Sequence, residues 1–224
     1  YGRLIQHYYD GTISFREKRT FNLDEYLGLP PNHPQSYRAT MVRDLTQYVD
    51  LPHDRFHVPP GISDDYDAAC TAYEDDIEAA GGVDLWVLGI GTDGHIAFNE
   101  VGSGKDTRTR VVGLAESTVA ANMSYFEDDP ALVPRQAVTA GVATIMDARE
   151  VVLLAKGATK APAVARAVCG DETGDTPASW LQSHGNCTFV LDHAAAVEIV
   201  AAAGAEAKEV RSHAGHTHSL DMSN

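Results

Sequence analysis

Residues 88–100 carry three titratable side chains close together: Asp93, His95 and Glu100. An imidazole flanked by two carboxylates can be held in one tautomer and can transfer protons near neutral pH. Gly94 separates the acid from the imidazole, so that both side chains can leave one tight turn. Glu100 can contact His95 if the segment between them turns back. The residue types and their spacing predict acid–base catalysis on a loop rather than a structural histidine.

Two further segments carry charged residues that could act as a general base or bind a phosphate. Asp24 and Glu25 follow a short strand predicted over residues 20–23, and one of the two should face a site because side chains alternate along an extended chain. That carboxylate is well placed as a general base. Lys160 ends the turn 156–160 between a strand and a helix, where an ammonium and a helix N-terminus suit a phosphate. The turn lacks the spacing of a Walker loop.

Charged and histidine-containing segments elsewhere give weaker signals. Arg108 and Arg110 would share a face of an extended segment, and such a pair suits an anionic ligand or a subunit contact in a homo-oligomer. A metal could bind to the histidines near the end of the chain, His213, His216 and His218, but we expect this segment to be a mobile polar tail. No dinucleotide fingerprint follows a strand, so the sequence predicts neither a cofactor nor a metal.

The elements around these segments predict an α/β fold. Residues 85–87 read as a buried parallel strand that leads into the histidine segment, and ligands bind at the carboxyl edge of such sheets. Further strands are expected at 151–155 and 187–191. Helices are expected from Ser36 to about residue 49, from the cap Ser63 to Gly81, from Lys160 to about Cys169, and over 194–207. This alternation predicts one doubly wound, Rossmann-like domain over residues 1–207, with a single mostly parallel sheet and helices on both faces. Residues 208–224 read as a disordered tail.

The amino-acid composition limits the classes of partner that the protein is expected to bind. With 17 Lys and Arg against 32 Asp and Glu, the net charge of −15 argues against nucleic acid and anionic membranes and leaves a small molecule. No apolar stretch approaches the roughly 18–20 residues of a membrane span. Cys70, Cys169 and Cys187 are too few for a disulfide framework, so we expect buried thiols in a cytoplasmic protein.

Two segments resemble the signatures of a known family. Residues 93–100 and 21–26 are similar to the two signature segments of the glucosamine-6-phosphate deaminases, and the similarity extends over most of residues 1–192. The resemblance implies conversion of glucosamine 6-phosphate and water to fructose 6-phosphate and ammonia. It implies no metal and no redox cofactor.

The resemblance also assigns roles to the candidate residues. His95 would open the sugar ring, with Asp93 and Glu100 orienting it and stabilising its charged form. Asp24 would move the C2 proton to C1, and Lys160 would pair with the phosphate. The remaining candidate substrate contacts are Glu25, Gly94, Arg108 and Arg110.

The chain departs from the family pattern at several places. Ser124 stands where an arginine is usual, Val101 replaces a proline, and Val112 occupies a position that is basic in allosterically regulated members. The family's first βα unit, which cradles the phosphate, is expected before Tyr1.

Three other functions are alternatives to the deaminase: a 6-phosphogluconolactonase-like hydrolase, an enzyme for another hexosamine 6-phosphate, and a non-catalytic sugar-phosphate-binding remnant. Glu100 and the acidic pair near residue 24 favour the deaminase.

Overall fold

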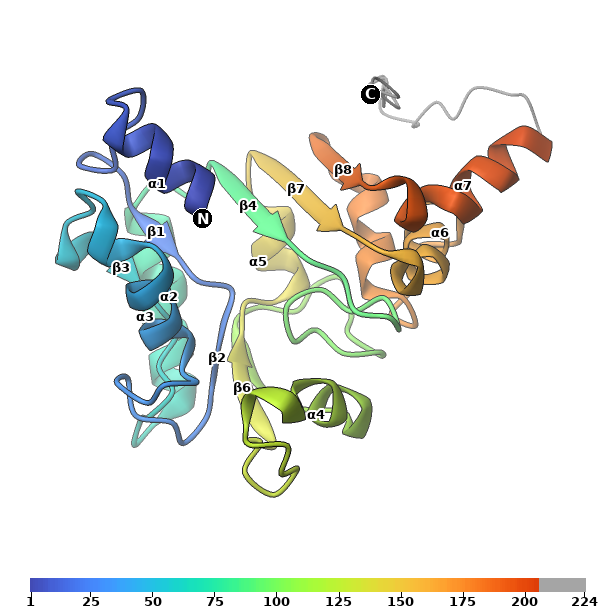
Figure 1. The fold of residues 1–224 in the computed structure, drawn as a ribbon. Helices are drawn as coiled ribbons and strands as arrows, with labels where there is room; N and C mark the ends of the chain where they lie inside the picture. The colour runs from blue at the N-terminus through green and yellow to red at the C-terminus, as the bar shows by residue number, and fades with distance from the viewer. Residues whose placement is uncertain (206–224) are drawn as a thin grey trace. The chain divides into compact units, whose positions relative to one another are not determined.

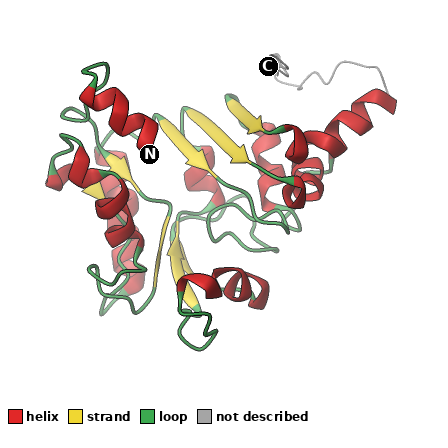
Figure 2. Ribbon diagram, viewed as in Figure 1, coloured by secondary structure: helices red, strands yellow, loops and turns green. Residues whose placement is uncertain are grey.

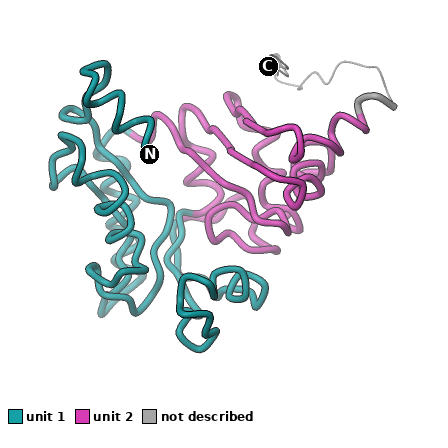
Figure 3. Tube along the Cα trace, viewed as in Figure 1, with its two compact units in different colours: residues 1–81, 109–140 teal, residues 82–108, 141–224 magenta. Residues whose placement is uncertain are grey.

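The computed structural model describes residues 1–205, in which helices and strands alternate (Figures 1 and 2). Residues 1–81 and 109–140 form one compact unit, called unit 1, and the segments beginning at residues 82 and 141 form unit 2 (Figure 3). The predicted α/β class is confirmed, while the domain bounds stay a prediction. The predicted tail and its three histidines lie outside the described residues.

The sheet of unit 2 consists of the strands that the apolar runs predict. Strands β4 (Leu85–Leu88), β7 (Glu150–Ala155) and β8 (Cys187–Leu191) are parallel, in the order β4-β7-β8. Trp86 pairs with Val151, and both are buried. The residues of the other face are about half exposed, at 47% for Leu85 and 50% for Val190. The expectation of strands buried throughout therefore holds for alternate residues only, because successive side chains point to opposite faces.

Helices and a long 3-10 segment complete unit 2. They are α5 (Val142–Met146), the 3-10 turn η4 (Ala158–Lys160), α6 (Ala161–Cys169), the 3-10 segment η5 (Pro177–Ser183) and α7 (His193–Ala205). Helix α6 packs against α7 and η5, and its buried residues, a stripe that includes Ala163 and Ala167, all precede its last two residues. Cys169 is exposed because it ends α6 beyond that stripe, so the expectation of three buried thiols is wrong for this one.

The strands of unit 1 form two sheets. Strand β1 (Thr20–Phe21) pairs with β3 (Phe56–His57) in parallel, whereas β2 (Asp24–Tyr26), β6 (Gln136–Thr139) and β5 (Arg110–Gly113) are antiparallel, in that order. The N–H of Asn22 still donates to His57, but the carbonyl of Leu23 already accepts from Ala140. The chain thus changes its pairing partner within the strand expected over 20–23. This change separates the two sheets of unit 1, so that with the sheet of unit 2 the described residues contain three sheets where the sequence predicts one.

Unit 1 also contains four α-helices, which lie before and between these strands along the chain. They are α1 (Gly2–Tyr9), α2 (Tyr37–Asp44), α3 (Tyr66–Ala79) and α4 (Glu116–Asn122), with 3-10 turns at Thr46–Tyr48, His53–Arg55 and Met123–Tyr125. Ser36 caps α2 as expected, with its Oγ 3.0 Å from the amide of Ala39. Helix α3 is capped by Asp65 and not by Ser63, since Asp65 Oδ1 accepts from the Ala68 amide at 3.0 Å. Among residues 1–205, no helix is both long and apolar enough to cross a bilayer.

Candidate active site

The loop that follows β4, residues 89–105, is called the histidine loop below. It begins with a tight turn in which the Gly94 amide donates to the Gly91 carbonyl at 3.1 Å and the Gly91 amide donates to the His95 carbonyl at 2.9 Å. Gly94 has a φ of +101°, and a Cβ there would lie 2.7 Å from the methyl group of Thr176. Both its conformation and its surroundings therefore require glycine.

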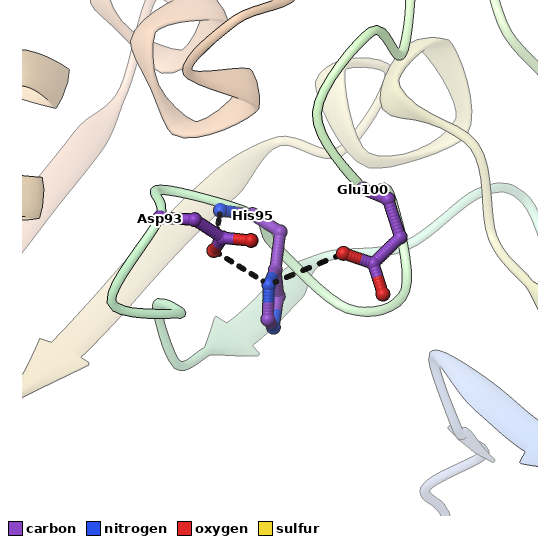
Figure 4. A group of neighbouring side chains, drawn as sticks. All are labelled: Asp93, His95 and Glu100. Atoms are coloured by element: carbon purple, nitrogen blue, oxygen red, sulfur yellow. Dashed lines mark hydrogen bonds and ion pairs between the residues drawn. The ribbon is translucent and has the colours of Figure 1, made fainter. Parts of the chain in front are cut away.

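Two carboxylates converge on one nitrogen of His95, as Figure 4 shows. Nδ1 lies 2.8 Å from Asp93 Oδ1 and 3.7 Å from Glu100 Oε2, and all three side chains are partly buried. The predicted return of Glu100 to His95 is confirmed. Since Nδ1 faces the carboxylates, Nε2 is the ring nitrogen on the opposite side, where a ligand could exchange protons with it. Two negative charges stabilise a positive charge on the ring.

Buried residues between His95 and Glu100 make the chain turn back. Ile96 is 0% exposed and Phe98 is 4% exposed, and Ala97 between them has a φ of +50°. Both the backbone and the side-chain amide of Asn99 donate to the carbonyl of Ile96, at 3.0 and 3.1 Å. The apolar residues anchor the segment and Asn99 closes its turn, so Glu100 is returned to the imidazole.

Gly91 provides the space in which the charged cluster lies. A Cβ at this position would overlap the imidazole ring of His95 and would lie 2.5 Å from Asp93 Oδ1. The backbone at Gly91 is thus in close approach to both side chains. Any larger residue there would displace the pair, so the role of Gly91 is to let Asp93 and His95 meet.

The same three groups have the spacing of metal ligands. One atom from each of Asp93, His95 and Glu100 lies within 4.8 Å of the others. Imidazole nitrogen and carboxylate oxygen are ligands that zinc accepts. The geometry therefore fits two chemistries, proton transfer by an imidazole between carboxylates or binding of a metal ion, and a chelator distinguishes them.

Asp24 has the properties of a general base in unit 1. It opens β2 and pairs with Thr139 of β6, which also pairs with Arg110 of β5, so the side chains of Asp24 and Arg110 lie on the same face of the sheet. Burial raises the pKa of the Asp24 carboxyl to about 7, and the charge of Glu25 contributes to the shift. A carboxyl group that ionises near neutral pH is suited to take a proton from a ligand.

The carboxylate of Glu25 accepts hydrogen bonds from the backbone, and its expected contact with substrate stays a prediction. Its Oε1 accepts from the amides of Tyr26 and Tyr37, both at 2.9 Å, and its Oε2 accepts from the amide of Arg38 at 3.0 Å. Burial raises the pKa of Glu25, and these hydrogen bonds oppose that shift. Because it satisfies free amides at the N-terminus of α2, Glu25 fixes this helix to β2. Alternation along the strand also puts it on the face opposite to Asp24.

Lys160 lies beside the start of the histidine loop. Its Nζ donates to the carbonyl of Ile90 at 2.6 Å, which joins the end of η4 to the residues that follow β4. The preceding turn uses Gly157 at a φ of +92°, whose amide donates to the carboxylate of Asp192. The structure thus brings the predicted phosphate ligand and the predicted acid–base cluster together within unit 2.

The two arginines have different surroundings. Arg108 belongs to unit 2, is exposed and pairs with Asp147. Arg110 belongs to unit 1, where burial lowers its pKa. Contact with an anionic ligand stays a prediction for both residues.

Two residues near the site have contacts that the sequence does not indicate. Thr176 packs against Gly94, and Gly91 underlies the imidazole. Thr176 is far from the loop along the chain, so no local spacing indicates its contact. No local spacing indicates that Gly91 lies under the imidazole either, since that contact depends on a side-chain position that only the folded loop defines.

The chain is similar to known proteins whose names refer to sugar phosphates. Residues 1–190 match a family model described as glucosamine-6-phosphate isomerases/6-phosphogluconolactonase. Glucosamine-6-phosphate deaminase 2 of Bacillus subtilis (strain 168) is 48% identical over 203 residues, which cover 90% of this chain and 82% of that protein. Glucosamine-6-phosphate deaminase of Rhodopirellula baltica is 51% identical, covering 88% of this chain and 78% of that protein.

Solved structures agree with the sequence comparison. A monomeric glucosamine-6-phosphate deaminase superposes with a TM-score of 0.85 at 39% identity, covering 88% of this chain and 81% of that one. The 6-phosphogluconolactonase from Trypanosoma cruzi reaches a TM-score of 0.64 at 22% identity, covering 82% and 73%. The second likeness is one of fold alone.

Proposed function

The chain belongs to the glucosamine-6-phosphate isomerase/6-phosphogluconolactonase family, and from this premise we propose that it converts glucosamine 6-phosphate and water to fructose 6-phosphate and ammonia. The observation that carries the proposal is the imidazole of His95 held between the carboxylates of Asp93 and Glu100. Ring opening of an amino sugar requires a group that protonates the ring oxygen and removes the proton of the C1 hydroxyl, and a histidine so placed can do both.

His95 performs the first step of the proposed reaction. Its imidazole takes the proton of the C1 hydroxyl and delivers a proton to the ring oxygen, so the C1–O5 bond breaks and an open-chain aldehyde forms. Asp93 and Glu100 stabilise the ring when it is charged and hold it in one orientation. Asp93 lies closer, at 2.8 Å from Nδ1, and so contributes the larger part of the charge stabilisation.

Asp24 performs the second step. Its carboxylate takes the proton from C2 while the carbonyl oxygen at C1 is protonated by solvent, which gives an enolamine. The carboxyl then returns its proton to C1, which gives a protonated ketimine at C2. Water adds to C2 and ammonia leaves, so the products are the ketose phosphate and ammonia. A carboxyl whose pKa is raised to about 7 is a stronger base than an ordinary aspartate, which favours removal of a carbon-bound proton.

We predict that Lys160→Ala weakens substrate binding. A charge-assisted contact with phosphate contributes about 1.5–3 kcal/mol, so the dissociation constant should rise roughly ten- to a hundredfold. Calorimetry with an acyclic analogue, 2-amino-2-deoxyglucitol 6-phosphate, measures it. Lys156→Ala, in the same turn, is the matched control and should bind normally. Unchanged affinity in Lys160→Ala would move the phosphate site elsewhere, to Arg108 or Arg110.

We predict that exhaustive treatment with EDTA leaves the turnover number unchanged. Proton transfer by His95 requires no metal, although the spacing of its cluster could hold one. The measurement compares ammonia release before and after dialysis against the chelator, with total metal determined in both samples. Loss of turnover that returns on adding zinc would assign the cluster to a metal instead.

The closest rival is hydrolysis of 6-phosphogluconolactone, which the same family includes. The deaminase is favoured because the relatives at 48% and 51% identity are deaminases, and because Glu100 supplies a second carboxylate to His95. Parallel assays decide: ammonia release from glucosamine 6-phosphate against acid release from the lactone. The proposal predicts the first activity and at most a trace of the second, and the reverse result would overturn it.

The setting of this activity is part of the proposal. Free cysteines and an acidic surface support a cytoplasmic enzyme of amino-sugar catabolism with a small-molecule partner. Other hexosamine 6-phosphates and a non-catalytic sugar-phosphate-binding role are the remaining alternatives. Assays with galactosamine 6-phosphate test the first, and the absence of any turnover would support the second.

A further inference from the structure

A segment remote in the sequence contacts the histidine loop at two places. This segment, residues 173–183, is called the bracing segment and includes η5. At the first contact, the amide of Ala178 donates to the carbonyl of Gly94 at 2.9 Å. Thr176 packs its methyl group where a side chain on Gly94 would lie. The turn between Asp93 and His95 is therefore held from outside.

The second contact holds the other end of the same loop. Trp180 Nε1 donates to the carbonyl of Ser103 at 3.2 Å, and the amide of Gly102 donates to the carbonyl of Gly174 at 2.8 Å. The Ser103 amide in turn donates to the carbonyl of Glu100 at 3.0 Å. The indole thus fixes the turn that carries Glu100, and it does so from the segment that fixes Gly94.

The bracing segment is itself internally bonded. Ser179 is 0% exposed, and its Oγ accepts from the Thr173 amide at 2.8 Å and donates to the Thr173 carbonyl at 3.1 Å. On the outside, the ammonium of Lys105 lies 5.6 Å from the centre of the Trp180 ring and 2.6 Å from Ser183 Oγ. A segment bonded in this way can transmit the position of one contact to the other.

We propose that Trp180 is a positioning residue that sets the separation of Glu100 from His95, and this inference rests on the proposed function. The buried residues between them turn the chain back, and the bracing segment fixes both ends of that turn from outside. Without the indole hydrogen bond, the turn at Ser103 loses one of its two ties to the bracing segment, and the position of Glu100 loosens with it. Ring opening slows because the charged imidazole loses part of its stabilisation, whereas binding of an open-chain ligand does not depend on that step.

The test uses Trp180→Phe in the full chain. Phenylalanine keeps an aromatic ring under Lys105 but lacks the N–H donor. We expect kcat to fall about ten- to a hundredfold, with KM and the inhibition constant of 2-amino-2-deoxyglucitol 6-phosphate within about twofold of the wild type. Trp86→Phe is the matched control, because the buried Trp86 Nε1 has no hydrogen-bond partner among the described residues. It should leave kcat unchanged.

A second variant disturbs the contact between the bracing segment and Ser103 by adding a methyl group. A Cβ on Gly174 would lie 3.1 Å from the Ser103 carbonyl oxygen, so Gly174→Ala pushes on the turn that Trp180 holds. It should also lower kcat while the alditol phosphate still binds, and it serves if Trp180→Phe does not fold. Wild-type kcat in both variants, or parallel loss of kcat and alditol affinity in a folded variant, would overturn the inference. A wild-type chain without deaminase activity would refute the proposed function instead.

Discussion

Replacing His95 by alanine is expected to reduce kcat for deamination about a thousandfold or more, with little change in thermal stability. General acid–base catalysis by one positioned side chain contributes about 10²–10⁴-fold, and His95 is the group that acts on both oxygens of the ring-opening step. The imidazole is partly exposed on a loop, whereas the neighbouring Ile96 and Phe98 are buried and keep the loop in place. The measurements are steady-state ammonia release and the melting temperature of both proteins.

The control for this variant is a histidine outside the site. His7 is exposed on α1, and His7→Ala should leave both kcat and the melting temperature unchanged. If His95→Ala retained turnover but melted at a much lower temperature, His95 would be a structural residue that braces its loop, and the assigned chemistry would be wrong.

Asp24→Asn is expected to abolish proton transfer at C2 and to lower kcat about 10²–10⁴-fold, while substrate still binds. Asparagine keeps the shape of the side chain but cannot take a proton. Since the pKa of Asp24 is raised to about 7, its basic form accumulates only above that pH, and kcat/KM of the wild type should rise with pH through about 7. Exchange of the C2 proton with deuterated solvent gives the direct readout, and exchange at the wild-type rate in the variant would exclude Asp24 as the base.

The same substitution, which lowers activity, is expected to raise the stability of the folded chain above neutral pH. In the folded chain Asp24 keeps its proton up to about pH 7, whereas the usual pKa of 3.8 applies when the chain is unfolded. Between these values the folded state binds more protons, so stability falls as pH rises from about 4 to 7. Asp24→Asn removes this cost and should melt above the wild type at pH 8, with the difference vanishing below pH 4. A lower melting temperature for the variant at pH 8 would contradict the assigned pKa.

Local signals in the sequence predicted the elements that carry the site. Continuous apolar runs located β4 and β7, because a buried parallel strand needs little beyond its own composition to be identified. The spacing of His95 and Glu100 indicated that they could meet, and the structure places them 3.7 Å apart. The turn before Lys160 was found for the same reason, since a glycine and a lysine between a strand and a helix form a local pattern.

What the sequence could not predict depends on partners far along the chain. The division of the unit 1 strands into two sheets follows from a change of pairing partner at Leu23, which the periodicity of the sequence does not indicate. The sequence does not indicate that Glu25 binds backbone amides, because two adjacent acids at a strand end offer no sign of which one does so. Its hydrogen bonds to the first amides of α2 decide that, and they exist only once the helix is folded against β2.

The most direct test of the central claim follows one reaction mixture by nuclear magnetic resonance. The full chain is incubated with glucosamine 6-phosphate that carries ¹⁵N at the amino group and ¹³C at C2. Chemistry at His95 and Asp24 predicts that labelled ammonium and a C2 ketone signal of fructose 6-phosphate appear together in equal amounts, and that neither appears with His95→Ala. Unchanged substrate with the wild-type chain, or release of ammonium without the ketose, would contradict the assignment of these residues to a deaminating isomerisation.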